Sequence, residues 1–91
     1  MNKQNGYNGI SIRIRFADLM HDATRVHLAT DLQRNVLAGA FAAVADDMGS
    51  LQAHDAAAHA YRIATDIYRG GNPTYATLSD AMARVNAQLA S

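Results

Sequence analysis

The stretch Leu32–Met48, LQRNVLAGAFAAVADDM, decides how this chain folds. Its larger apolar residues recur at gaps of four, three and four, which places one apolar stripe along an α-helix. The stripe consists of Leu37, Phe41, Val44 and Met48. Small residues, mostly alanine, surround it. A helix with so smooth a surface lets neighbours approach on more than one side, so we expect it to be the central helix of a small bundle.

The composition limits both the architecture and the kind of function. A length of 91 residues fits one domain, and alanine dominates the 49% of residues that are apolar. Alanine buries little area, at about 25 cal/mol per Å² of apolar surface, so a single copy gains little stability from its core. We therefore expect a homodimer. The formal net charge of zero argues against bulk attraction to nucleic acid or anionic lipid as the main activity.

The residue types that are missing from the chain exclude several kinds of functional site and of protein. The chain contains no cysteine, which rules out disulfides, thiolate metal sites and thiol catalysis. No run approaches the ~20 apolar residues that a membrane-spanning helix needs, and the N-terminus has no secretory leader pattern. We expect a cytoplasmic protein.

Residues 10–16, ISIRIRF, alternate strictly between apolar and polar side chains. This is the period of a half-buried strand, and it predicts one short N-terminal β-strand. Because no other segment has this pattern, the backbone groups of the strand need a partner from a second copy or from another protein's sheet edge. The preceding residues 1–9 are polar, contain two Asn-Gly pairs and predict a flexible tail.

From residue 17 onward the sequence predicts helices only. Thr30 and Gln33 fit a capping box at a helix start, but no other signal divides residues 17–48, which therefore form either one helix or two. Gly49 predicts the end of this segment, and Ser50 the N-cap of the next helix.

The C-terminal part of the chain predicts one more helix boundary. Gly70-Gly71 ends the helix that starts at residue 51, and Pro73 takes the first position of the last helix. The predicted fold class is all-α: a small bundle of three or four helices with one short N-terminal β-strand. Residues 10–91 form its single helical domain.

The N-terminal half resembles the ribbon-helix-helix family of DNA-binding proteins. The resemblance rests on the strand ISIRIR, on the two helices expected after it, and on the apolar rhythm of residues 35–41, NVLAGAF. It covers residues 10–45. It implies that two copies pair their strands antiparallel and that Ser11, Arg13 and Arg15 enter the major groove, where arginine pairs with guanine.

No motif indicates catalysis or a cofactor. The four histidines lack the spacing of three or four that two ligands on one helix face require, so we expect no metal site. No nucleophile elbow, P-loop or dinucleotide fingerprint is present, so we expect no enzyme, no cofactor and no small-molecule substrate. Asp46 and Asp47 form an acidic pair in the last turn of a helix, where the helix dipole disfavours them, and this misfit could mark a contact with a basic partner.

These observations favour a non-enzymatic binding protein, a small regulator or inhibitor whose partner is another protein. Small phage- or plasmid-encoded inhibitors, including anti-defence proteins, are of this physical type. Its candidate contact residues are Ser11, Arg13 and Arg15 of the strand, and Asp46 and Asp47 of the helix end. The alternative is a dimeric DNA-binding transcriptional regulator that uses the strand of residues 10–16.

Overall fold

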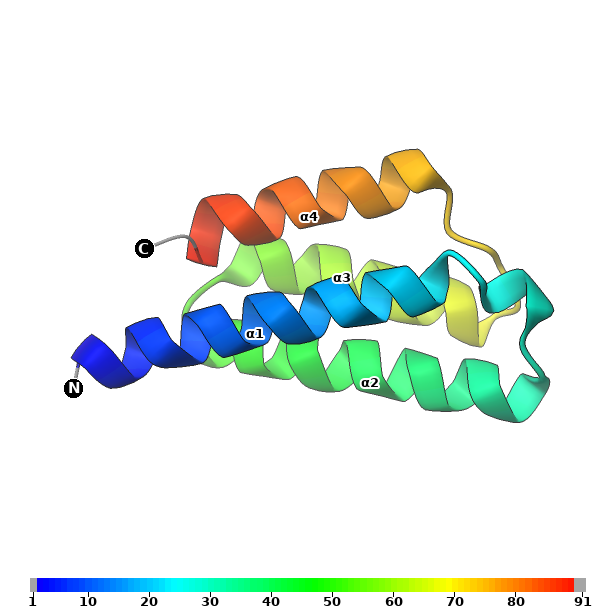
Figure 1. Ribbon diagram of the computed structural model, residues 1–91, viewed down its shortest axis with the longest axis horizontal. Helices are drawn as coiled ribbons and strands as arrows, with labels where there is room; N and C mark the ends of the chain where they lie inside the picture. The colour runs from blue at the N-terminus through cyan, green and yellow to red at the C-terminus, as the bar shows by residue number, and fades with distance from the viewer. Residues whose placement is uncertain (1, 90–91) are drawn as a thin grey trace.

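The chain forms a bundle of four antiparallel helices in a computed structural model, which describes residues 2–89 and the side chains of residues 9–89 (Figure 1). The helices are α1 (Asn2–Ala23), α2 (Asp31–Ser50), α3 (His54–Tyr68) and α4 (Tyr75–Leu89), with a short 3-10 helix η1 (Val26–Leu28) between α1 and α2. Each helix packs against two others: α1 and α3 both contact α2 and α4. No helix among the described residues is long and apolar enough to cross a membrane.

The core lies between the four helices and is entirely apolar, since no polar or charged residue is buried among the described side chains. Phe16 of α1 and Phe41 of α2 are fully buried and meet edge to face, with ring centroids 5.7 Å apart and an interplanar angle of 82°. This T-shaped contact is the favoured geometry for an aromatic pair. Buried alanines of α2 and α3 let these two helices make the most extensive contact of the bundle.

The prediction of a β-strand at residues 10–16 is wrong, because these residues lie within α1. The same residues also fit a helical spacing of four. Ile12 and Phe16, four positions apart, are buried, while Ile10 and Ile14 are 48% and 58% exposed. A lone strand would leave its backbone groups without partners, whereas a helix pairs them within the segment. Residues 2–9, where the sequence indicates a tail, are also helical, and Met1 lies outside the described residues.

The stripe of α2 points into the core as the sequence predicts, but α2 is not central. Phe41, Val44 and Met48 are fully buried and Leu37 is half-buried. The helix occupies one corner of a four-membered ring, with α1 on one side and α3 on the other. Its remaining side faces solvent.

Residues 17–48 form two helices, which settles the question that the sequence leaves open. The capping box is present: Thr30 Oγ1 accepts a hydrogen bond from Gln33 N at 3.1 Å, and Gln33 Oε1 accepts one from Thr30 N at 2.9 Å. These two bonds satisfy donors that a helix start would otherwise leave free. The chain between α1 and this cap turns through η1.

The turn between α2 and α3 differs from the predictions made for Gly49 and Ser50. The helix continues past Gly49 to Ser50, and Ala53, not Ser50, precedes α3 without a side-chain cap. A Schellman motif ends α2, in which Gln52 N donates to Gly49 O and Ala53 N donates to Met48 O. Gln52 occupies the left-handed position of this motif, with φ of 68°.

We expect Gln52→Gly to stabilise the protein by about 1 kcal/mol, because glycine adopts a left-handed φ without the steric penalty of a side chain. Gly70 holds the equivalent position after α3, with φ of 92°, so Gly70→Ala is expected to destabilise by a similar amount. Urea unfolding followed by circular dichroism measures both changes. A loss of stability in Gln52→Gly would contradict the described turn.

The turn between α3 and α4 begins where the sequence predicts and ends differently. Gly70 N donates to Ile67 O and Gly71 N donates to Asp66 O, which completes a Schellman motif, and a Cβ atom at Gly71 would collide with the Asp66 side chain. Pro73 is not the first residue of α4. Thr74 caps this helix instead, since its Oγ1 accepts a hydrogen bond from Thr77 N at 3.1 Å.

Candidate functional site

The outer face of α2 is an unusual surface for a helix at the edge of a bundle. It carries a second row of apolar and small residues at gaps of four, three and four, all of them exposed: Leu32, Val36, Gly39 and Ala43. Leu32 is 72% exposed and Val36 is 65% exposed. An edge helix normally presents polar residues to water, and one that is apolar on both faces is normally covered on both.

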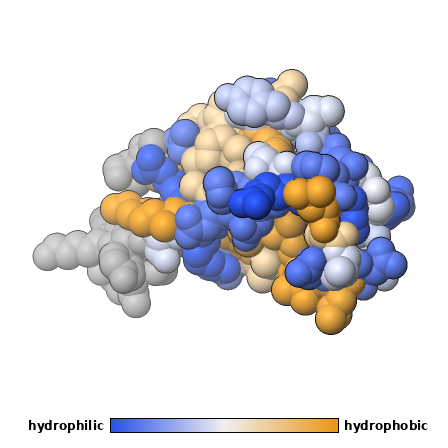
Figure 2. Space-filling view, turned by 45° about the vertical axis from the view of Figure 1, so that its right-hand side comes forward, coloured by the Kyte–Doolittle hydropathy of each residue, from blue (hydrophilic) through white to orange (hydrophobic). Residues whose placement is uncertain are grey.

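A groove between α1 and α2 extends this outer face toward the side. Its volume is about 530 Å³, and apolar side chains line most of it, namely Leu19, Val26, Ala29, Leu32, Val36, Leu37 and Ala40. Asp22, Arg25 and Gln33 are its polar residues. Figure 2 shows apolar surface at the lower right of the molecule, toward the end of the bundle at which α2 begins. Contiguous exposed apolar surface of this kind marks contact sites on proteins.

The residues predicted from the strand do not form one outward-facing row. Ser11, Arg15 and Asp47 come together instead beside a shallow hollow of about 260 Å³ between α1 and α2. Arg15 Nη1 donates to Asp47 Oδ2 at 2.6 Å, so the two predicted contact residues neutralise each other. Arg13 is half-buried, and its Nε is buried without a hydrogen-bond partner among the described residues.

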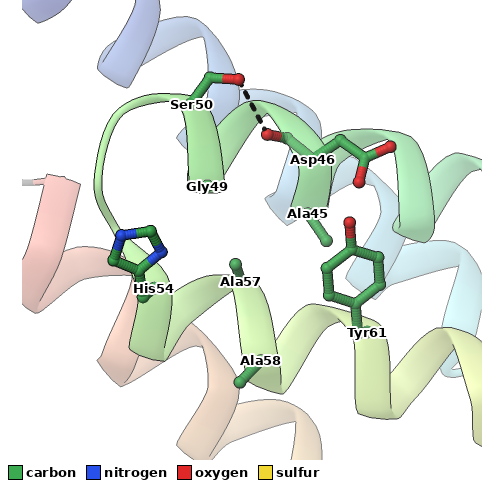
Figure 3. A pocket seen from close by; sticks show the side chains of 8 residues that line it. All are labelled: Ala45, Asp46, Gly49, Ser50, His54, Ala57, Ala58 and Tyr61. Carbon is green, nitrogen blue, oxygen red and sulfur yellow. Dashed lines mark hydrogen bonds between the residues drawn. The ribbon is translucent and has the colours of Figure 1, made fainter.

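Asp46 lies apart from this ion pair, at a hollow of about 620 Å³ between the end of α2 and the start of α3 (Figure 3). The buried Ala45 and Ala57 are among the residues lining it, and Tyr61 points its hydroxyl group toward the Asp46 side chain. No ion pair joins Asp46 to another described side chain. A carboxylate beside an aromatic ring and small apolar residues suits the cationic head and aliphatic stem of an arginine or lysine.

Other polar side chains hold α3 and α4 together. His59 Nδ1 lies 2.8 Å from Asp55 O, and its Nε2 lies 3.5 Å from Asp80 Oδ2. Arg84 lies near both carboxylates, 3.4 Å from Asp55 and 3.7 Å from Asp80. Among the described side chains, no group of three or more histidine, aspartate or similar ligands could hold a metal ion. We interpret this cluster as a structural clamp between two helices.

Comparisons with protein-family models, with curated proteins and with solved structures each found no match. The assignment of a function therefore depends on the surface described above. Sequence reasoning overlooked the outer face of α2, although its row of residues has the same four-three-four spacing as the core stripe. The signal was present in the sequence, since a helix with two such stripes needs two apolar neighbours.

Proposed function

We propose that this chain is a non-enzymatic binding protein, a small regulator or inhibitor that acts by contact with another protein chain through the outer face of α2 and the adjoining groove. The exposure of Leu32 and Val36 supports this proposal most strongly. Both are large apolar residues on a regular helix, and neither closes the core.

The placement of the titratable residues favours contact with another protein over catalysis. Arg15 is paired with Asp47, and Asp46 lies exposed on a helix surface. Arg13 is half-buried in α1 and lines none of the hollows described above. Catalytic groups instead gather in a concave site that binds substrate and excludes water. The apolar groove lacks such a gathering of acids, bases or nucleophiles, and its chemistry suits the apolar face of a protein helix.

The proposal predicts that two negative charges on the outer face abolish binding and leave the fold intact. We expect Leu32→Glu/Val36→Glu to keep wild-type helicity and stability to within about 0.5 kcal/mol, because both sites are exposed and glutamate favours helices. The tagged wild-type chain and the tagged variant are isolated from cells that produce them. Proteins that are retained by the wild-type chain should be absent from the variant. Each of these proteins should then bind the purified wild-type chain directly.

Ala83→Glu/Ala87→Glu is the matched control, because it places the same charges at the same spacing on an exposed part of α4. This control should retain the same proteins as wild type. If the α2 variant also retained all of them, the outer face of α2 would not be the binding surface.

A further inference from the structure

We propose that the partner seated on the outer face of α2 is a second copy of this chain, so that two α2 helices pack antiparallel about a two-fold axis near Gly39. This inference rests on the proposed function, because it names the partner of the same surface. It explains why α2 looks like a central helix in sequence and yet lies at the edge of one copy. In the dimer α2 has neighbours on three sides.

Gly39 is the first observation in favour of this packing. It lies in the middle of α2, where glycine weakens a helix relative to alanine, and it is exposed. An added Cβ atom would meet nothing within 4 Å inside the chain, so no contact of the single copy requires a glycine here. A second helix that crosses close to this point would require a small residue, and Ala43 continues the smooth surface one turn later.

The surface also suits its own copy in shape. An isologous two-fold contact requires that one patch contain both a projecting part and a recess to receive it. Leu32 and Val36 project from the N-terminal half of α2. About a two-fold axis near Gly39 they lie opposite the C-terminal half of α2 in the other copy, where Ala43 and the hollow beside Asp46 leave room. The projecting residues of each copy can therefore enter this recess in the other.

The charges complement each other when the two α2 helices run antiparallel. Asp46 lies at the C-terminal end of α2, while Arg69 at the end of α3 lies near its N-terminal end, where Arg34 Nη1 donates to Gly71 O at 2.8 Å. Both Asp46 and Arg69 are exposed, and neither forms an ion pair with a described side chain. An antiparallel pairing brings opposite ends together on the α3 side, so Arg69 of each copy approaches the Asp46 hollow of the other.

A neutral chain adds no net repulsion to such a pairing, and antiparallel helix dipoles attract. Each copy contributes mainly one helix face to this contact, whereas a standard interface of about 1,600 Å² involves about 20–30 residues a side, so we expect a dimer that dissociates on dilution. Sedimentation equilibrium on purified full-length chain, at concentrations up to about 1 mM, measures its dissociation constant.

Leu32→Glu/Val36→Glu should raise this dissociation constant more than about tenfold, while Ala83→Glu/Ala87→Glu should leave it unchanged. Asp46→Arg and Arg69→Asp should each weaken the dimer about fivefold, and the double reversal should restore it. Circular dichroism of each variant checks that it is folded.

A wild-type chain that stays monomeric over the whole concentration range would overturn the inference. The same result would leave the proposed function standing, because binding of a different protein to the outer face is tested separately by retention. A dimer that persists in Leu32→Glu/Val36→Glu would also overturn the inference, since the contact would then lie elsewhere. Failure of the double reversal to restore affinity would overturn the antiparallel pairing.

Discussion

Replacing Phe41 by alanine is expected to lower the free energy of unfolding by about 3–5 kcal/mol. Phe41 is fully buried and packs edge to face on Phe16, so its removal leaves a cavity between α1 and α2. Small domains are stable by only about 5–15 kcal/mol in total, and this core is rich in alanine. The variant should therefore unfold at much lower urea concentration than wild type, as followed by circular dichroism at equilibrium.

Two controls separate this effect from a general sensitivity to substitution. Phe41→Leu keeps an apolar side chain of similar bulk and should cost clearly less than Phe41→Ala. Tyr75→Ala removes an aromatic ring that is 81% exposed and should change the stability by less than about 0.5 kcal/mol. A loss for Phe41→Ala no larger than that for Tyr75→Ala would show that the helices do not pack as described.

The second large effect distinguishes a helix from a strand at residues 10–16. Ile12→Asp places a charge where the side chain is 4% exposed and should destabilise the protein by more than about 3 kcal/mol. Ile14→Asp changes a side chain that is 58% exposed and should shift the stability by less than about 0.5 kcal/mol. Urea unfolding of the two variants under identical conditions measures this difference.

A strand and a helix at residues 10–16 predict different relative losses of stability for these two variants. In a strand, Ile12 and Ile14 would lie on the same face and the two substitutions would have similar effects. In α1 they lie on different faces, and only Ile12 reaches the core. Equal losses of stability in the two variants would contradict the helix.

Local patterns predicted those parts of the fold that local physics decides. The Thr30–Gln33 capping box, the end of α3 at Gly70-Gly71 and the core stripe of α2 all follow from residues close together in sequence. Each depends on hydrogen bonds or on apolar spacing within one helix. Such features can be predicted because no distant contact competes with them.

The wrong predictions concern features that are decided by contacts between residues distant in sequence or by an exception to a local rule. Residues 10–16 fit both a period of two and a helical spacing, and only packing against the rest of the bundle decides between them. Gln52 stands at a left-handed position that sequence rules assign to glycine, and so Gly49 wrongly marked the end of α2.

The candidate site could be predicted only in part. Asp46 does lie beside a hollow that suits a basic side chain, and whether a partner occupies it stays a prediction. Arg15 and Asp47 were predicted as separate contact residues, but they form an ion pair across 32 positions of sequence. A pairing over that distance depends on how α1 lies on α2, which no local pattern encodes.

Site-specific photo-cross-linking from position 32 tests most directly whether the outer face of α2 is a binding surface. A photo-reactive amino acid in place of Leu32, irradiated in the cells that produce the chain, should become joined to a second protein chain. The product is either twice the mass of the chain or the sum of its mass and that of another protein. The same amino acid at the exposed position Ala83 of α4 should give little product. Equal yields from the two positions, or none from position 32, would contradict the account.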